Sequence, residues 1–283
     1  MSEFYAITKI KRDSTFEMKN EHYHNYYEFY FLLSGRRKFF LNNKLYHVHA
    51  GDLMVIPKGE IHRTTYFPED VEQSGDMMYG LHDHERYALL FDDEMIAQLK
   101  KEIGENGFHS CFEHRQITIP LNRRAYIEEL FEKLLQESKG NDEFSKILCK
   151  RYCEEIILML IRCQRHQEPE VVPMGIEDKQ MEKAAQYMST HFQENLTLKD
   201  MANKCCMSES YFSRRFKQVT GFGFKEYLNT IRIRHACDLL LMTNKSIMEI
   251  SEECGYMDSN YFGDAFRKVK NVSPSKYRKA NLV

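Results

Sequence analysis

The sequence predicts an α+β protein of more than one domain, in which a small β-barrel or sandwich precedes an all-helical region. Between residues 29 and 61, short β-rich runs alternate with Gly, Asn and Pro turn signals, as in compact antiparallel folds. After residue 120, apolar residues recur at helical spacing, and from residue 176 onward only helical patterns follow. The 283 residues are enough for roughly two domains.

Six short segments read as strands: 29–33, 38–41, 45–48, 53–56, 87–91 and 116–119. Two helices with apolar stripes follow, one around Ile127–Leu135 and one from Leu148 to Cys163. Residues 168–175 hold two prolines and a glycine without a stripe, which predicts a linker. The predicted domains are therefore 1–100 (β-rich barrel), 101–175 (helical support, dimerisation and linker) and 176–283 (helical).

Composition excludes several classes of protein. The longest apolar run, residues 156–161, is far shorter than the roughly 20 residues that a membrane-spanning helix needs. Residues 1–21 lack the apolar core of a signal peptide. We therefore expect a cytoplasmic protein with no membrane partner. Its eight cysteines include no CxxC pair, so buried free thiols are expected rather than disulfides or a zinc site.

The charge is divided unequally along the chain. The formal net charge is −2, which by itself argues against a nucleic-acid binder. Residues 176–283, however, carry 17 Lys and Arg against 13 Asp and Glu, a net charge of +4, and the rest of the chain carries −6. Basic residues gather further in 208–234 and 264–283. Such local patches can neutralise phosphates even on a neutral chain, although a solvated helix face would look the same.

The helical region contains an internal repeat, with a spacing of 50 residues. Ser208–Lys217 is similar to Asp258–Arg267, and the repeated positions are Tyr211/Tyr261, Phe212/Phe262, Phe216/Phe266, Lys217/Arg267 and Val219/Val269. The phenylalanines and valines share one helix face in each copy, so that face is expected to be buried. The remaining positions face outward.

A short capped helix precedes each copy. Thr197–Asp200 and Ser246–Glu249 both have the [ST]xx[DE] pattern of a capping box, in which two side chains satisfy each other's free backbone amides. We expect these helices to run through Ala202 and Ser251. A short helix, a turn and a one-sided helix form a helix-turn-helix unit. The sequence predicts two units, at about 198–219 and 246–269, joined by a long helix; a helical repeat bundle is the alternative.

With these motifs in place, the region from about 180 to 280 resembles the DNA-binding domain of the AraC/XylS family of bacterial transcription regulators. The segments that carry the resemblance are Ser208-x-x-Tyr-Phe-Ser-Arg-x-Phe-Lys217, Thr220-Gly-x-Gly-Phe-x-x-Tyr-Leu228, Ile231-Arg-Ile-x-x-Ala236, Gly255-Tyr256, Tyr261-Phe262 and Asn271-x-Ser-Pro-x-x-Tyr-Arg278. The resemblance implies two recognition helices in successive major grooves, which recur about every 34 Å.

The position in the motif then implies the DNA-binding residues, which are Ser210, Ser213, Arg214, Lys217, Ser259, Asn260, Gly263, Asp264 and Arg267. Arg214 suits guanine and Asn260 suits adenine. Asp264 departs from the family, and either accepts a hydrogen bond from cytosine or weakens binding by repelling phosphate. Asn271 stands where the family usually has glycine, and Asn is the next best residue for a left-handed turn.

The N-terminal region contains two spaced motifs of its own. His22-x-His24-x3-Glu28-x6-Gly35 is followed by Gly51-x5-Pro57-x-Gly59-x2-His62. These resemble the paired motifs of the cupin barrel over about 20–90, although the glycine before His22 is missing and Tyr66 replaces an Asn. His22 and His24 share a strand face, and three imidazoles with one carboxylate suit a first-row divalent metal.

Three interpretations of this cluster remain open. His22, His24, Glu28, Tyr30 and His62 bind a small-molecule effector, or the four motif residues His22, His24, Glu28 and His62 hold a divalent metal, or the cluster is a structural polar network. No cofactor is required by the first and third. Tyr26, Tyr30 and Phe39 could stack on a sugar. His82 and His84 form a second pair, which we expect at the surface.

Taken together, the sequence predicts a transcription regulator and not an enzyme, with a cupin-like sensor followed by a double helix-turn-helix domain. The expected partners are promoter or operator DNA, a small-molecule effector for which a sugar is one candidate, RNA polymerase, and a second copy of the chain. The mechanism that the resemblance implies is a ligand-dependent change in domain placement. Two alternatives remain: a metal-dependent cupin enzyme, and an effector-independent DNA-binding regulator with a degenerate barrel.

Overall fold

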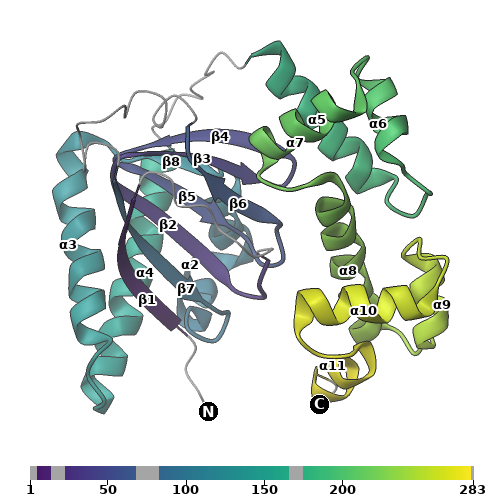
Figure 1. Ribbon diagram of the computed structural model, residues 1–283. Helices are drawn as coiled ribbons and strands as arrows, with labels where there is room; N and C mark the ends of the chain where they lie inside the picture. The colour runs from purple at the N-terminus through teal and green to yellow at the C-terminus, as the bar shows by residue number, and fades with distance from the viewer. Residues whose placement is uncertain (1–4, 14–22, 68–82, 166–174, 282–283) are drawn as a thin grey trace.

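We describe the protein from a computed structural model, covering residues 5–13, 23–67, 83–165 and 175–281. A β-barrel with a helical layer on one side is followed by a separate helical domain, which packs on the other side of the barrel (Figure 1). The predicted linker at 168–175 lies outside the described residues except for Gly175, which caps the first helix of the helical domain.

The barrel is made of two antiparallel sheets. The strands are β1 (Tyr5–Arg12), β2 (Tyr27–Ser34), β3 (Arg36–Leu41), β4 (Lys44–His49), β5 (Asp52–Ile56), β6 (His62–Thr65), β7 (His84–Phe91) and β8 (Gln116–Thr118). One sheet has the order β1-β7-β2-β5-β8 and the other has the order β4-β3-β6. Side chains alternate between the two faces of each strand, so each sheet has an inner face toward the barrel interior and an outer face.

Each strand predicted from the sequence overlaps one in the structure, but two strands were not predicted. The first, β1, is an edge strand in which Ile7 is the single buried position. The second, β6, is buried at all four positions although it reads His-Arg-Thr-Thr. The expectation that His84 lies at the surface was wrong, because His84 begins β7 and is fully buried. His82 lies outside the described residues.

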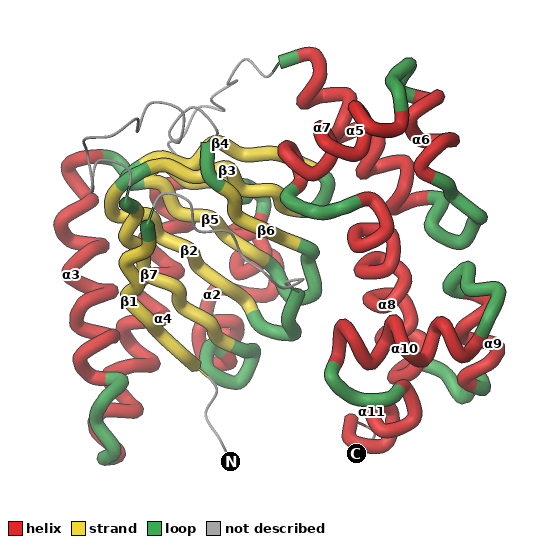
Figure 2. The backbone as a smooth tube through the Cα atoms, viewed as in Figure 1, coloured by secondary structure: helices red, strands yellow, loops and turns green. Residues whose placement is uncertain are grey.

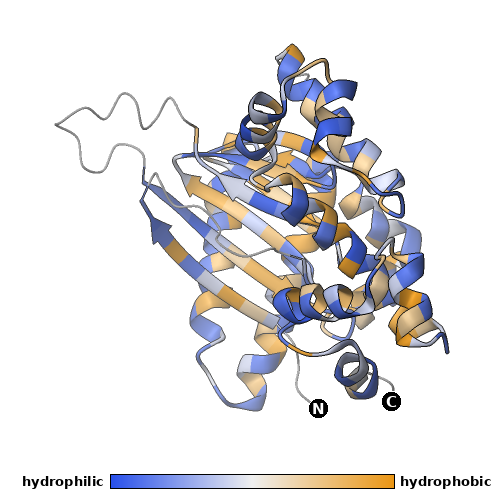
Figure 3. Cartoon of the chain, turned by 45° about the vertical axis from the view of Figure 1, so that its right-hand side comes forward, coloured by the Kyte–Doolittle hydropathy of each residue, from blue (hydrophilic) through white to orange (hydrophobic). Residues whose placement is uncertain are grey.

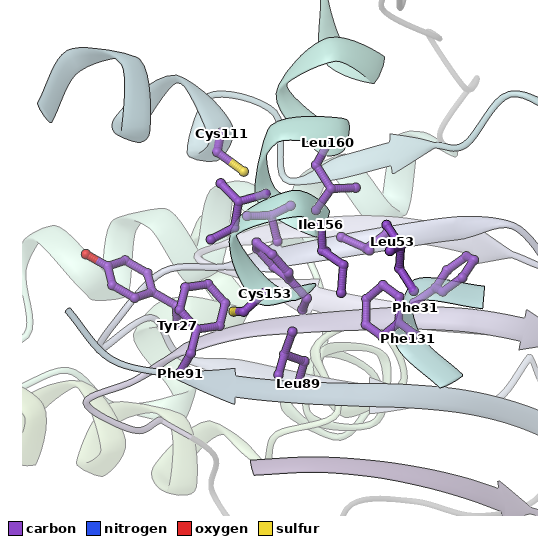
Figure 4. Close-up of a cluster of buried hydrophobic side chains, with 14 of the residues drawn as sticks. Tyr27, Phe31, Leu53, Leu89, Phe91, Cys111, Phe131, Cys153, Ile156 and Leu160 are labelled. Carbon is purple, nitrogen blue, oxygen red and sulfur yellow. The ribbon is translucent and has the colours of Figure 1, made fainter. Parts of the chain in front are cut away.

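A helical layer covers the outer face of the five-stranded sheet. It contains α2 (Ala97–His109), the short 3-10 helix Ser110–Phe112, α3 (Leu121–Glu137) and α4 (Glu143–Gln164). The apolar stripes of α3 and α4 interdigitate with the odd-numbered residues of β2 and β7, as the contact of Phe31 with Phe131 illustrates (Figure 4). The helical pattern predicted from apolar spacing is thereby confirmed.

The helical domain contains α5 (Ile176–Thr190), α6 (Leu198–Lys204), α7 (Glu209–Thr220), α8 (Phe224–Met242), α9 (Ile247–Glu253), α10 (Ser259–Lys270) and α11 (Pro274–Asn281). Helix α8 runs from the first group of helices, α5–α7, to the second, α9–α11 (Figure 2). Each group has its own core, built on Phe212 and Phe216 in the first and on Phe262 and Phe266 in the second. The 50-residue sequence repeat is therefore also a structural repeat.

Hydrophobic residues are concentrated in the strands and on inward helix faces, and the outer helix surfaces are mostly hydrophilic (Figure 3). None of the helices in the described part of the chain is long and apolar enough to cross a membrane. All eight cysteines are free thiols, and six of them are buried, as the sequence predicts.

Candidate DNA interface and barrel ligand site

The first helix-turn-helix unit consists of α6 and α7. The predicted capping box is present, with the Asp200 amide donating to the Thr197 hydroxyl and the Thr197 amide donating to the Asp200 carboxylate. The helix it begins runs two residues beyond the predicted end. Ser208 caps α7, and Gly221 ends it in a left-handed conformation with φ of 79°. Local side-chain chemistry thus sets where the recognition helix starts and stops.

The outward face of α7 carries the side chains predicted to contact DNA. Phe212 and Phe216 are fully buried, whereas Ser210, Arg214 and Lys217 are exposed and Ser213 is half-buried. The next residue, Arg215, pairs instead with Glu177 and Asp178 of α5 at 3.2 and 2.6 Å, which fixes the helix against its own domain. Arg214 and Lys217 therefore place positive charge on the solvent-exposed face of α7.

The second unit, α9 and α10, repeats this arrangement with one difference. Ser246 and Glu249 form the predicted capping box, and Asp258 caps α10. Asn271 ends α10 with φ of 59°, which confirms the predicted left-handed turn. Ser259, Asn260, Asp264 and Arg267 are exposed, and Gly263 is half-buried. The Asp264 carboxylate lies 2.9 Å from the Arg267 guanidinium, so these opposite charges meet on the outward face.

Helix α8 and one buried arginine tie the two units together. The Arg232 guanidinium donates to the carbonyl oxygens of Phe192 and Glu194, both at 2.8 Å, in the loop from α5 that leads into the first unit. It also lies 5.2 Å from the ring centre of Tyr256 in the second unit. One residue therefore contacts both units, and the spacing between α7 and α10 is held by a stiff helix and a polar cross-brace.

Inside the barrel, three of the four predicted motif residues come together. Glu28 projects from β2, His62 from β6, and His24 from the segment before β2. The Glu28 carboxylate lies 2.8 Å from His24 Nε2 and 3.3 Å from His62 Nε2, and all three potential ligand atoms lie within 4.8 Å of one another. The fourth residue, His22, lies outside the described residues.

Backbone carbonyls orient both imidazoles of this cluster. His24 Nδ1 contacts the Tyr26 carbonyl at 3.1 Å, and His62 Nδ1 contacts the Glu60 carbonyl at 2.9 Å. Each ring therefore donates through Nδ1 and presents Nε2 to Glu28. Burial favours the neutral form of Glu28, but hydrogen bonds with His24 and His62 outweigh it and lower the pKa of this carboxyl well below its usual range. Two imidazole nitrogens and a carboxylate are also a donor set that fits a first-row divalent metal.

Aromatic rings line the interior next to this cluster. Phe39 stacks on His62 with ring centres 6.0 Å apart, and Tyr30 contacts Phe39 edge-to-face at 5.2 Å. Both aromatic side chains are fully buried. Tyr26, the third ring predicted for stacking, lies half-buried 5.9 Å from His24.

The outer face of the β4-β3-β6 sheet packs against α5, the turn between α7 and α8, and the first turn of α8. Phe40 contacts the rings of Phe222 and Tyr227. The Asn43 side chain accepts hydrogen bonds from Tyr227 and Ser189, and the Leu45 amide donates to the Glu182 carboxylate of α5 at 2.7 Å. The sequence contained no signal for this contact, because it joins residues far apart in the chain.

A buried arginine on β6 is central to that interface. The Arg63 guanidinium donates to the Gly221 carbonyl at 2.6 Å and to the Glu226 carboxylate at 2.7 Å, and lies 3.9 Å from the ring centre of Phe222. We call the contact of Arg63 with Gly221, Phe222 and Glu226 the Arg63 latch. It holds the turn that links the recognition helix α7 to α8. A Cβ on Gly221 would meet Arg63 Cδ at 2.6 Å, so only glycine allows this approach.

Comparisons with known proteins agree with this architecture. Residues 201–280 match the family described as a helix-turn-helix domain, and residues 14–70 match the family described as a cupin domain. The transcriptional activator RhaR of Mannheimia succiniciproducens is 23% identical over 95% of this chain and 93% of its own length. An uncharacterized HTH-type transcriptional regulator of Staphylococcus aureus is 22% identical over 88% of this chain, which spans 31% of that relative's length.

Among solved structures, the C-terminal domain of AraT from Geobacillus stearothermophilus is 37% identical over 38% of this chain and 91% of that domain, with a TM-score of 0.37. ToxT from Vibrio cholerae is 16% identical over 97% of this chain and 98% of its own, with a TM-score of 0.39. By description, RhaR is a transcriptional activator and AraT is a response regulator.

Proposed function

This chain belongs to the AraC/XylS family of transcription regulators, and we propose that it binds a specific operator under the control of a small-molecule effector held in its barrel. Binding to DNA through the helix-turn-helix domain and regulation of transcription follow from the family. The effector, the individual base contacts, the dimer, the contact with RNA polymerase and the cytoplasmic location are parts of the proposal.

The observation that carries the DNA-binding part is the paired, one-sided burial of α7 and α10. Each helix buries two phenylalanines and leaves a polar face exposed, and Arg232 braces the two units. In the proposal, Arg214 reads a guanine and Asn260 reads an adenine, while Lys217 and Arg267 neutralise phosphates. Asp264 moderates Arg267, because the two side chains form an ion pair.

The experiment that tests this part is selection of genomic DNA fragments by the purified full chain, followed by binding measurements on the recovered sequence at several salt concentrations. A regulator binds one short sequence class, and its affinity falls steeply with salt because phosphate contacts release counterions. Stoichiometric metal, turnover of a substrate and absence of salt-dependent DNA binding would instead establish the metal-dependent cupin enzyme.

The effector part rests on the position of β6 between two environments. His62 points into the barrel, where it meets Glu28 and Phe39, and the next residue, Arg63, points out to the Arg63 latch. A ligand that contacts His24, Glu28, Tyr30 and His62 would therefore act on the strand that holds the first recognition helix. We propose that effector binding changes the stability of this docked arrangement, and through it the affinity for DNA.

A divalent metal at His24, Glu28 and His62 is a second candidate for the occupant of the barrel, favoured by the convergence of the three ligand atoms. Bound there, it would supply a positive charge to which an oxygen of the effector could coordinate. Elemental analysis of the full chain and of His62→Ala decides between the two: one metal per chain that is lost in the variant establishes the metal, whereas no metal in either protein leaves the direct hydrogen-bonding role.

We also propose that the chain is a homodimer that associates through the outer surface of α3 and α4. These helices lie on the opposite side of the barrel from the helical domain (Figure 1). Their outer surface exposes large apolar side chains: Leu121, Tyr126, Phe144, Ile147, Leu148 and Leu158. A second copy on this face would bury them and leave both DNA-binding domains free.

A further inference from the structure

The recognition helix α7 carries a tyrosine that lies beside the side chain assigned to base reading. Tyr211 and Arg214 are three residues apart, so they are neighbours on the helix surface. The Arg214 guanidinium lies 5.5 Å from the centre of the Tyr211 ring, within the range of a cation–π contact. Tyr211 is half-buried, whereas Arg214 is exposed. The ring therefore gives a long, solvated side chain a surface to lie against.

The far end of the Tyr211 ring is held by another helix. Its hydroxyl donates a hydrogen bond to Glu177 Oε1 at 2.9 Å, and this bond raises the pKa of Tyr211, so the hydroxyl keeps its proton. Glu177 lies in the first turn of α5, which packs beside α7 (Figure 1). The ring is thus anchored at two points, by its own backbone on α7 and by its hydroxyl on α5.

The same carboxylate also holds the residue that follows Arg214. Glu177 Oε2 lies 3.2 Å from Arg215 Nε, and Asp178 Oδ1 accepts a hydrogen bond from the Arg215 guanidinium at 2.6 Å. Glu177 therefore contacts two positions of α7 that flank Arg214, one three residues before it and one directly after it. Acidic residues in a first turn suit the helix dipole without any such contact. Both oxygens of Glu177 nevertheless engage the recognition helix.

The second unit differs from the first at this point. At the repeat spacing of 50 residues, Asp264 stands in the place of Arg214. Tyr261, the counterpart of Tyr211, is 54% exposed, and its hydroxyl accepts a hydrogen bond from the Asn229 side chain of α8 at 3.5 Å. The tyrosine that donates to a carboxylate thus occurs in the unit whose recognition helix carries an arginine at the outward position.

We propose that Tyr211 is a positioning residue that determines base specificity: anchored by Glu177, it directs the Arg214 guanidinium toward one base edge. The inference rests on the proposed function, because it assigns the arrangement through which Arg214 reads DNA. A bidentate contact with guanine needs the guanidinium plane in one orientation. A free arginine samples many rotamers, and ordering it on DNA costs binding energy. Against the Tyr211 ring, Arg214 has lost part of that freedom before DNA binds, so the matching base pair gains more than any other.

The test measures base discrimination by the full chain on the operator recovered by DNA selection. Discrimination is the dissociation constant for an operator with one base pair replaced, divided by that for the selected operator. Arg214→Ala identifies the base pair that Arg214 reads, since discrimination falls at that position. Tyr211→Phe keeps the ring and removes only the hydroxyl. In this variant discrimination at that base pair should fall about two- to fivefold, which is the contribution of a cation–π contact at an exposed site. The salt dependence of binding should stay that of the parent, because no phosphate contact is removed.

Substitutions of Glu177 test the anchor from the other helix. Glu177→Ala should lower discrimination at least as much as Tyr211→Phe does, and adding Tyr211→Phe to it should lower discrimination no further, because both changes break the same hydrogen bond. Glu177→Gln keeps an oxygen that can accept from the hydroxyl, so its discrimination should lie nearer to that of the parent. Tyr261→Phe, the matched change in the second unit, should leave discrimination at this base pair unchanged.

A positioning role requires that the effect of Tyr211 depend on Arg214. In the Arg214→Ala background, Tyr211→Phe should therefore change neither discrimination nor affinity. An effect of full size in that background would mean that the hydroxyl contacts DNA itself. Unchanged discrimination in Tyr211→Phe, with or without a uniform loss of affinity, would mean that Arg214 needs no anchored ring. Either result would overturn the proposal.

The same measurements distinguish failure of this role from failure of the proposed function. If Arg214→Ala lowers discrimination and Tyr211→Phe does not, the positioning role fails and the regulator stands. If the parent chain binds no specific sequence with salt dependence, the proposed function itself fails.

Discussion

The Arg63 latch leads to a prediction that can be worked through from its geometry. Arg63→Met removes two hydrogen bonds, to Gly221 and Glu226, and a cation–π contact with Phe222, while it keeps an apolar stem of similar length. Hydrogen bonds that involve a charged group contribute about 1.5–3 kcal/mol each. Burial of the guanidinium offsets part of this, and Glu226 keeps its second bond, to the Gly223 amide at 2.9 Å. We therefore expect a net loss of about 2–3 kcal/mol in docking free energy, or roughly 30- to 150-fold.

One backbone amide reports this change directly. The Leu45 amide donates across the interface to the Glu182 carboxylate, so it is protected only while the two domains are docked. Native-state hydrogen exchange measures how often that protection is lost. In Arg63→Met the exchange of the Leu45 amide should accelerate by roughly 30- to 150-fold. Amides in the barrel core, such as that of Phe31, should keep the rate of the parent protein.

Two variants control for charge and for folding. Arg36→Met removes an exposed guanidinium from the adjacent strand of the same sheet and should leave exchange at Leu45 unchanged. In Arg63→Lys the exchange rate of the Leu45 amide should lie between those of the parent and of Arg63→Met. Unchanged exchange at Leu45 in Arg63→Met, with a normal far-UV spectrum, would show that apolar contacts alone hold the domains together, and the role assigned to the Arg63 latch would be refuted.

Further predictions address DNA binding, acid stability and assembly. Arg214→Ala should cost about 1–3 kcal/mol in DNA-binding free energy and relax specificity at one base pair. Lys217→Ala should instead weaken binding to all sequences alike and reduce the slope of log affinity against log salt concentration by about 1. If Arg214→Ala weakened binding equally to the selected operator and to mutated operators, its proposed role in reading a base would be contradicted. Burial opposes ionisation of Asp93, but hydrogen bonds from two lysines outweigh it and lower its pKa to about 2. Because this pKa lies below the value of about 3.9 in the unfolded chain, the ionised carboxylate stabilises the fold above about pH 4 and loses that contribution as the pH falls toward 2. In Asp93→Asn the free energy of unfolding should therefore fall less between about pH 4 and pH 2 than it does in the parent, as acid unfolding monitored by circular dichroism would measure. Ile147→Glu should yield monomers in sedimentation analysis while the neighbouring Lys146→Glu does not, and a dimer that survives Ile147→Glu would place the interface elsewhere.

The helical domain was predictable nearly to the residue because its signals are local. Thr197, Ser208, Ser246 and Asp258 each cap a helix within a few residues of themselves, and the paired phenylalanines repeat at helical spacing. Capping is decided by side chains that reach no farther than the next turn. The two units could therefore be located from sequence without knowledge of the rest of the fold.

The barrel was only partly predictable, because β6 breaks the rule that strands alternate apolar and polar residues. Inside the barrel, His62 faces a polar cluster, and on the outer face Arg63 and Thr65 face another domain. Neither environment leaves a hydrophobic pattern. The partner of Arg63 lies 163 residues away at Glu226, so no window along the sequence contains both. His84 was misplaced for the same reason, since its burial depends on residues brought together only by the barrel.

The same strand that could not be predicted connects the two proposed activities. His62 and Arg63 are consecutive residues of β6, so a change in the position of one is transmitted to the other by the rigid backbone of a paired strand. Coupling of this kind is reciprocal. If bound effector lowers the docking equilibrium constant of the two domains by some factor, then undocking the domains raises the affinity for the effector by that same factor. Arg63→Met should therefore change the affinity of the chain for its effector although Arg63 lies outside the barrel interior. An unchanged affinity would mean that docking and effector binding are independent, and that the signal leaves the barrel by a route other than β6.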